Sequence, residues 1–179
     1  MKPGTIESQR VYTGRVINLD VDTVRFPDGS VGSLEMIRHQ GASAVIPVLG
    51  DLSEPDPLLL LVRQYRYAAD SYLYEIPAGR LEKGESPDQC AARELKEEVG
   101  CTAGRIRPLL TMYTTPGFTD EQIHLFVATE LSRGDTAHER EEFITPEQMT
   151  LSDALGRIRT GQIIDGKTAL AILFLQTFR

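Results

Sequence analysis

The chain has little of several features that would assign it to a class of proteins. Its two cysteines, Cys90 and Cys101, are too few for a disulfide framework, and no CxxC pair offers a zinc site. The apolar stretches at 58–62 and 169–175 are far shorter than the ~20 residues that a membrane span needs. The start of the chain, MKPGTIESQR, holds no apolar signal core. These absences favour a cytoplasmic, soluble protein with no membrane partner.

Positive charge is also scarce. Lysine and arginine number 19 against 26 acidic residues, which gives a formal net charge of −7. Surfaces that bind nucleic acid are usually basic, so this balance argues against a nucleic-acid partner. An anionic substrate would then need local help from metal ions or arginines. The length of 179 residues and the 41% hydrophobic content suit one globular domain with a small N-terminal extension.

The order of apolar runs and turn residues predicts a mixed sheet between helices. We expect a strand pair within 10–40, with a turn at 26–29, and further strands at 42–49, 58–67, 72–76, 106–113 and 122–131. Residues 151–159 and 168–178 have helical periodicity, and 132–142 form a long polar loop. Strands and helices do not alternate regularly, so the expected class is α/β with a mixed (α+β) sheet.

A further predicted helix carries three carboxylates at helical spacing. Glu94, Glu97 and Glu98 share one flank, an arc on the order of 100° wide. Leu95 and Val99 fall on the adjacent flank and give the helix an apolar side to bury. Two unit charges ~4 Å apart repel by about 4 kcal/mol at an effective dielectric of ~20. A hard divalent cation removes that repulsion, and Mg²⁺ takes oxygen ligands while it keeps positions open for phosphate.

The alternative is a solvated helix in which Arg93 and Lys96 pair with these acids. The flanking residues favour the metal platform. Residues 86–89, SPDQ, form a start signal with a capping serine, a first-turn proline and a glutamine that closes a capping box. Gly100 stands where a helix commonly ends. The order is therefore strand, glycine-bounded loop, acidic helix and loop.

This segment resembles the signature of the Nudix hydrolases, which is G, five residues, E, seven residues and REUxEExGU, where U is a bulky aliphatic residue. The matching positions are Gly79, Glu85, Arg93, Glu94, Leu95, Glu97, Glu98 and Gly100. Cys101 departs at the last aliphatic position, which concerns packing more than chemistry. The resemblance covers about 41–179. It implies an α/β/α Nudix sandwich with an N-terminal β-hairpin extension, and a pyrophosphohydrolase acting on a nucleoside diphosphate linked to another group.

The resemblance also implies roles for individual residues. The metal ligands would be Ala78 through its carbonyl, Glu94, Glu97, Glu98 and Glu141, and the catalytic groups would be Glu97, Glu98 and Glu139. Mg²⁺ is the expected cofactor, with Mn²⁺ as a substitute. Glu85 and Arg93 would brace the loop and the helix. In the polar loop the base Glu139 and the ligand Glu141 could be exchanged, and Glu142 could take part.

Two segments outside the signature are similar to the subgroup that acts on ADP-ribose and related nucleotide sugars. The implied substrate-binding residues are Arg63, Arg66, Pro116, Gly117 and Glu121, with Arg66 as the phosphate-contacting arginine. The alternatives are a basic surface strand and an ordinary Pro-Gly turn. Leu34 and Glu35 stand where similar proteins often carry an Arg-Glu pair. GDP-mannose, other nucleotide sugars and a dinucleotide therefore stay open as substrates.

The resemblance further implies a homodimer in which the N-terminal strands exchange. We expect an extension over 1–40, serving as a dimerisation element, and a catalytic domain over 41–179. A monomer could use the same hairpin. A Nudix-like domain that senses a nucleotide without cleaving it is the alternative of another class, although the complete set of acids argues against it.

Residues 161–168, GQIIDGKT, match the Walker A pattern and suggest a phosphotransferase. A P-loop follows a buried strand, however, and here a helical segment precedes the glycine, with too little chain after Thr168 for the rest of such a domain. We therefore expect a junction between two helices, with Asp165 or Thr168 as the cap of the last one. On this interpretation, replacing Lys167 by alanine should be nearly silent.

Overall fold

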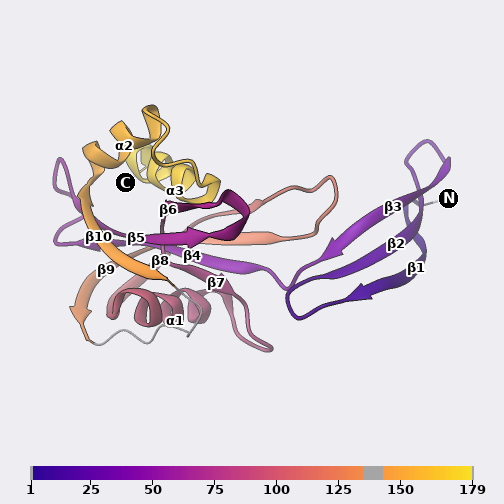
Figure 1. The fold of residues 1–179 in the computed structure, drawn as a ribbon, viewed down its shortest axis with the longest axis horizontal. Coiled ribbons are helices and arrows are strands. Elements are labelled where there is room, and N and C mark those ends of the chain that lie inside the picture. The colour runs from indigo at the N-terminus through magenta and orange to yellow at the C-terminus, as the bar shows by residue number, and fades with distance from the viewer. Residues whose placement is uncertain (1, 135–142, 179) are drawn as a thin grey trace. The chain divides into compact units, whose positions relative to one another are not determined.

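The structure is a computed structural model that describes residues 2–134 and 143–178. The chain forms two compact units. The first contains 1–41 and 112–122, and the second contains 42–111 and 123–179. Figure 1 shows the order of the elements along the chain.

The second unit is built on a seven-stranded sheet. Its strands are β4 (Ala42–Leu49), β5 (Leu58–Arg66), β6 (Ser71–Glu75), β7 (Ala78–Arg80), β8 (Cys101–Tyr113), β9 (Gln122–Arg133) and β10 (Ile144–Thr150). The order is β10-β5-β4-β9-β8, with β6 paired to β5 and β7 paired to β4. Strand β4 runs parallel to β9 and antiparallel to β5 and β7, so the sheet is mixed, as predicted.

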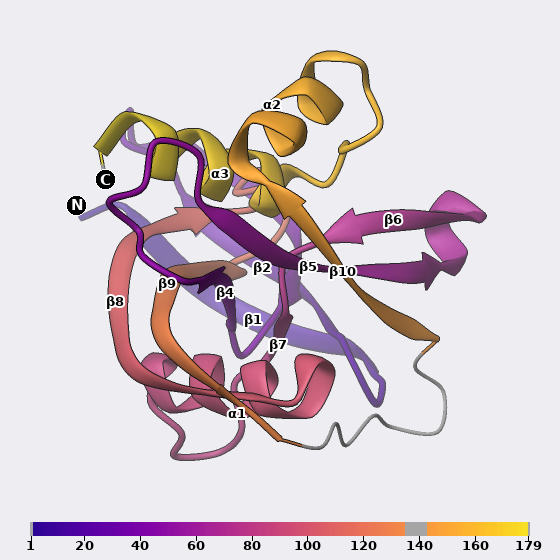
Figure 2. The ribbon, with the colours of Figure 1, turned by 90° about the vertical axis from the view of Figure 1, so that its left-hand side faces the viewer.

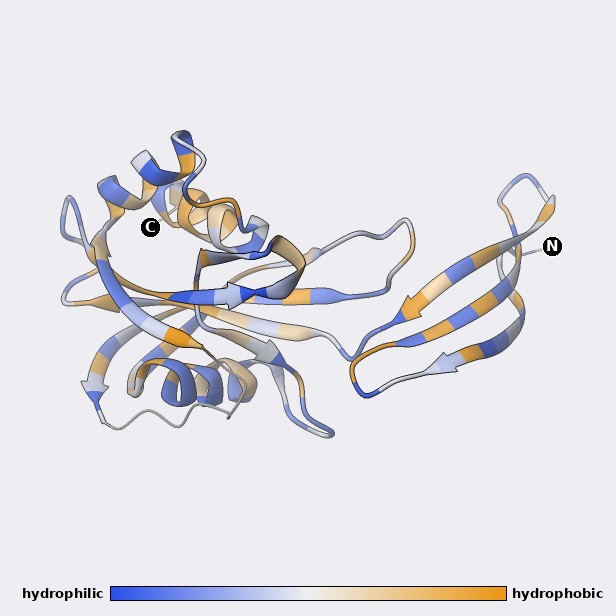
Figure 3. Ribbon diagram, in the orientation of Figure 1, coloured by the Kyte–Doolittle hydropathy of each residue, from blue (hydrophilic) through white to orange (hydrophobic). Residues whose placement is uncertain are grey.

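Helices cover both faces of this sheet. Figures 1 and 2 show α1 (Pro87–Val99) on one face, and α2 (Leu151–Arg159) with α3 (Gly166–Phe178) on the other. A short 3₁₀ turn, Tyr67–Ala69, joins β5 to β6. In Figure 3, α1 carries mainly hydrophilic colours, whereas α3 is mainly apolar. The predicted α/β/α sandwich is confirmed.

The core beneath α1 explains how this helix is held. Leu95 and Val99 pack with Val45 of β4, Val62 of β5 and Phe126 of β9, all of them buried. The apolar flank of α1 is therefore anchored on three strands. No helix in the described ranges is long and apolar enough to cross a membrane.

Two short strands of this unit were not predicted. Strand β7 has only three residues and lies inside the expected glycine-bounded loop. Strand β10 contains Pro146, which reads as a strand breaker. Among the described residues β10 is an edge strand paired with β5 alone, so the missing N–H of the proline is tolerated there. Strand β8 also begins at Cys101, earlier than the expected 106.

The first unit holds a three-stranded antiparallel sheet in the order β1-β2-β3. Its strands are β1 (Gly4–Thr13), β2 (Asn18–Arg25) and β3 (Val31–Arg38). The predicted pair corresponds to β2 and β3, and the turn lies at 26–29, where Gly29 has a φ of 88°. The extension is a three-stranded sheet rather than a hairpin. Strand β1 escaped prediction because all of its residues are exposed, so burial imposes no apolar alternation on it.

The two acidic residues of β2 are its buried ones. Asp20 and Asp22 are 6% and 2% exposed, whereas the apolar residues beside them are only partly buried. Asp20 pairs with Arg10 of β1 and with Arg38 of β3, and Arg38 also pairs with Asp22. Ion pairs across the three strands therefore hold this sheet together on that face.

Candidate active site

The acidic helix begins and ends where local signals predict. The N–H of Ser86 donates to Oε1 of Gln89 at 3.0 Å within a capping box, and Pro87 is the first helical residue. Gly100 closes the helix with a φ of 64°, and its N–H donates to the carbonyl of Lys96 at 3.0 Å. These limits keep all three carboxylates within the helix, and the buried contacts of Leu95 and Val99 fix its rotation.

Two carboxylates of α1 are buried against strand β7. Glu94 and Glu98 lie one turn apart and are 7% and 3% exposed. The Glu94 carboxylate lies against Gly79, where any Cβ would collide with it. The N–H of Ala78 donates to Oε2 of Glu98 at 3.3 Å. Glu97 lies further round the helix, with its side chain 39% exposed. The structure thus brings together Ala78, Glu94 and Glu98 of the predicted ligand set, with Ala78 contacting Glu98 through its N–H.

Arg93 braces the helix against the loop before it. Its Nε donates to Oε1 of Glu85 at 2.9 Å, and its Nη2 donates to the carbonyl of Arg80 at 3.0 Å. Its Nη1 donates to Oε2 of Glu97 at 3.0 Å and also to Glu94. The hydrogen bonds that Arg93 donates to the Glu85 carboxylate lower the pKa of Glu85 and raise the pKa of Arg93. Arg93 therefore pairs with Glu85 across the loop and with Glu97 on the helix at the same time.

The donor atoms of this cluster suit a hard divalent cation. They are oxygens from two buried carboxylates, set against the backbone of 78–79. Within the described residues no three acidic, histidine or cysteine groups form a preorganised metal centre, and Arg93 engages both Glu94 and Glu97. The predicted base Glu139 and ligand Glu141 lie outside the described residues.

Arg66 presents a cation on the Glu98 side of the sheet. Its Nε and Nη2 donate to the two carboxylate oxygens of Glu75 at 2.6 and 2.9 Å. The bond to Glu75, and then the charges of Glu75 and Glu98, raise the pKa of Arg66. Its Nη1 makes no hydrogen bond to any described residue, and the side chain is 41% exposed. One edge of the guanidinium therefore remains for a ligand.

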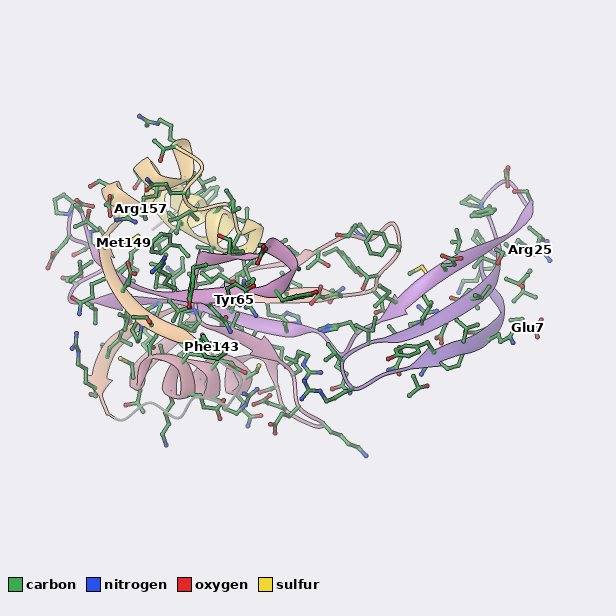
Figure 4. All side chains as sticks on the ribbon, in the orientation of Figure 1. Glu7, Arg25, Tyr65, Phe143, Met149 and Arg157 are labelled. Carbon is green, nitrogen blue, oxygen red and sulfur yellow. The ribbon has the colours of Figure 1, made fainter. Side chains whose placement is uncertain are left out.

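The second predicted arginine lies on the other face of β5. Side chains alternate along a strand, so Arg63 and Arg66 point to opposite faces. Arg63 stacks over the ring of Tyr72 at 4.7 Å and lies opposite Tyr74 of β6. The Tyr74 ring is covered at 4.9 Å by Arg157 of α2, which Figure 4 labels. Arg63 thus faces the α2 side, away from α1.

The remaining predicted substrate residues belong to the first unit. They are Pro116, Gly117 and Glu121. Pro116 and Gly117 form the centre of a β-turn, in which the N–H of Phe118 donates to the carbonyl of Thr115 at 3.2 Å. Glu121 lies 3.4 Å from Nδ1 of His39.

Sequence reasoning missed an ionic network behind Arg66. Glu75 is 2% exposed and pairs with both Arg66 and Lys167. Lys167 also lies 3.0 Å from Oδ2 of Asp165. A helix precedes this Walker-like segment and its lysine is paired internally, so it is not a P-loop. The expectation that Lys167→Ala would be nearly silent is revised, because that change takes one of its two cations from the buried Glu75. A charged residue in the apolar run YLYEIP was the available signal, because a buried carboxylate needs a partner.

Comparisons with known proteins agree with this geometry. A family model for the NUDIX domain matches residues 38–167. The chain therefore belongs to the Nudix family, whose hydrolases generally need divalent metal ions.

Three curated relatives are close in sequence. The ADP-ribose pyrophosphatase of Bacillus subtilis (strain 168) is 40% identical over 174 residues, 96% of this chain and 91% of the relative. The methanol dehydrogenase activator of Bacillus methanolicus has the same identity and coverage. The GDP-mannose pyrophosphatase of Escherichia coli O139:H28 is 37% identical over 129 residues, 66% of either chain.

A solved structure shares the fold. The crystal structure of an ADP compounds hydrolase has a TM-score of 0.83 at 22% identity and covers 99% of this chain and 94% of its own. The expected enzyme class, a hydrolase acting on phosphoric anhydrides, agrees with the family and with the pyrophosphatases among the relatives.

Proposed function

We propose that this protein is a Mg²⁺-dependent pyrophosphohydrolase that cleaves the diphosphate of ADP-ribose or a similar nucleotide sugar. The products are a nucleoside monophosphate and a sugar phosphate. The observation that carries the proposal is the pair of buried carboxylates, Glu94 and Glu98, against Ala78 and Gly79, with the Arg66 cation on the same side. Relatives named ADP-ribose pyrophosphatase and GDP-mannose pyrophosphatase support it.

Each group has a defined task in this proposal. Glu94, Glu98 and the Ala78 carbonyl hold the ion, and Glu97 assists. A bound divalent ion supplies charge neutralisation for the diphosphate and lowers the pKa of a bound water. Arg66 donates its remaining N–H groups to a phosphate oxygen, as arginine forks do.

Other roles stay part of the proposal on the family resemblance alone. Glu139 acts as base and Glu141 as an additional ligand, while Pro116, Gly117 and Glu121 contribute to substrate binding. Arg63 faces the α2 side and is assigned no phosphate contact. A cytoplasmic location, and no nucleic-acid partner, remain predictions.

Product identification tests the reaction. Purified protein is incubated with ADP-ribose, GDP-mannose, a UDP-sugar and a dinucleotide, each with Mg²⁺ or Mn²⁺, and products are identified by mass spectrometry. We expect AMP and ribose 5-phosphate from ADP-ribose, and none when the ions are chelated.

GDP-mannose is the second candidate substrate. Relatives that carry this name favour it, and Leu34 stands where an arginine is common in similar proteins. GMP and mannose 1-phosphate as the faster products would select it. Tight nucleotide binding without any product would instead point to a sensing domain.

We also propose that the protein is a homodimer joined through its first unit. Strand β1 is an edge strand whose ten residues are all exposed. Ile6, Val11 and Tyr12 are 51%, 50% and 56% exposed. A long, exposed and partly apolar edge strand is rarely left uncovered in a soluble protein. A second copy of this sheet would cover it.

A further inference from the structure

The start of α3 is tied to the strand segment that leads into the acidic cluster. Thr168 is fully buried, and its Oγ1 accepts a hydrogen bond from the N–H of Ile76 at 2.9 Å. The same hydroxyl donates to Oδ2 of Asp165 at 2.6 Å, so its orientation is fixed. Asp165 also caps α3, because its Oδ2 accepts from the N–H of Thr168 at 3.0 Å.

The neighbouring lysine is tied to the preceding residue of the same strand. Lys167 is 11% exposed at its side chain, and its Nζ pairs with Oε2 of Glu75 and with Asp165. Glu75 in turn holds Arg66 through two parallel hydrogen bonds. Segment 165–168 therefore fixes two consecutive residues, Glu75 and Ile76.

Glu75 and Ile76 come just before Ala78 of the proposed metal site in the chain. Pro77 follows Ile76 and has no N–H, so the bond from Ile76 to Thr168 is the last that the backbone donates before Ala78. On the other side, the carbonyl of Pro77 accepts from the N–H of Val45 at 2.9 Å. The backbone just before Ala78 is thus held by α3 through the N–H of Ile76 and by β4 through the carbonyl of Pro77.

The charges around Arg66 also link Lys167 to the proposed phosphate site. The two bases Arg66 and Lys167 balance the two acids Glu75 and Asp165. Without Lys167, Arg66 alone must neutralise a carboxylate that is 2% exposed. A diphosphate approaching Arg66 would then also meet an uncompensated negative charge.

We propose that Asp165, Lys167 and Thr168 are positioning residues for the reaction. Through Glu75, Lys167 sets the orientation and net charge that Arg66 offers to a substrate phosphate. Through Ile76, Thr168 sets the position of the Ala78 carbonyl at the metal site. The GKT sequence that suggests a P-loop thus organises a phosphate site through other residues. This inference rests on the proposed function.

Two pairs of variants separate positioning from mere stabilisation. For Thr168→Val, we expect the dissociation constant for Mn²⁺, measured on the substrate-free protein by electron paramagnetic resonance, to rise about tenfold. Thr168→Ser should restore it to within about twofold. For Lys167→Met, we expect the KM for the substrate to rise about tenfold with a smaller change in kcat, and Lys167→Arg to recover part of it.

Controls and contrary outcomes are defined by the same measurements. Arg157→Met removes a cation from the Asp153 ion pair on α2 and should leave KM and the Mn²⁺ affinity at the wild-type level. If Thr168→Val and Lys167→Met lower only the melting temperature, the proposal is wrong. If Lys167→Met does not fold, Lys167→Gln removes the same charge and keeps a polar side chain, and an unchanged KM in that variant overturns the proposal.

The proposed function can fail separately. If the wild-type protein cleaves no nucleoside diphosphate derivative, the function is wrong. The Mn²⁺ affinities of the two Thr168 variants then decide the positioning proposal without any substrate. Equal affinities in wild type and Thr168→Val would overturn it.

Discussion

At the residue scale, replacing Gly79 by alanine tests whether Glu94 is a metal ligand. A Cβ there would collide with the Glu94 carboxylate, which is the flexible end of its side chain, so the carboxylate must swing away. We expect Gly79→Ala to weaken Mn²⁺ binding by at least about tenfold with only a small loss of melting temperature. Gly156→Ala is the control, because a Cβ at Gly156 in α2 meets open space. Equal Mn²⁺ affinity in the two variants would contradict the assignment of Glu94.

Glu98 offers a test of charge at constant volume. Its carboxylate is buried against the backbone of β7, so Glu98→Gln keeps the packing and removes the negative charge. We expect turnover to fall by at least ~10²-fold while circular dichroism and the melting temperature stay close to wild type. Glu97→Gln should cost less, since Glu97 is the more exposed carboxylate. Unchanged turnover in Glu98→Gln would remove Glu98 from the metal site.

At the element scale, the attachment of α3 to the sheet should depend on pH. Burial alone would raise the pKa of Glu75, but the hydrogen bonds and charges of Arg66 and Lys167 outweigh it and keep this pKa below its usual value. A carboxylate with a lowered folded-state pKa stabilises the fold fully above its unfolded pKa of about 4.3, and loses that contribution as pH falls through the folded pKa.

Urea unfolding from pH 7 to pH 3 measures this dependence. We expect Glu75→Gln to be less stable than wild type at pH 7 and the difference to shrink below about pH 4. Glu35→Gln, which removes an exposed carboxylate from β3, should follow the wild-type curve. A difference between wild type and Glu75→Gln that stays constant down to pH 3 would contradict the ionised state of Glu75.

Helix α1, strand β5 and helix α3 show which features could be predicted from the sequence. Helix α1 was predicted at its true limits because its signals are local, namely the capping box at 86–89 and Gly100. The opposite faces of Arg63 and Arg66 were also within reach, since their spacing in one strand is odd. The contact of Lys167 with Glu75 could not be predicted from the sequence, because 92 positions separate the two residues and the packing of α3 on the sheet brings them together.

At the scale of the whole molecule, the exposed strand β1 leads us to predict a homodimer. Val11 and Ile6 are half exposed on an edge strand, so a partner copy would bury them. We expect light scattering after gel filtration to give twice the 19.9 kDa of one chain for wild type, and one chain mass for Ile6→Glu combined with Val11→Glu. A buried, unpaired carboxylate costs several kcal/mol in such an interface.

Ile164→Glu is the control, because it also places a glutamate at an exposed apolar residue, here one of the second unit that is 64% exposed. It should remain dimeric if the first unit carries the interface. A wild-type mass of one chain would refute the dimer, and loss of the dimer in Ile164→Glu alone would move the interface to the second unit. Activity measured on the monomeric variant then decides whether the first unit serves catalysis: a loss of turnover with an unchanged melting temperature means that a partner's strands complete the substrate site.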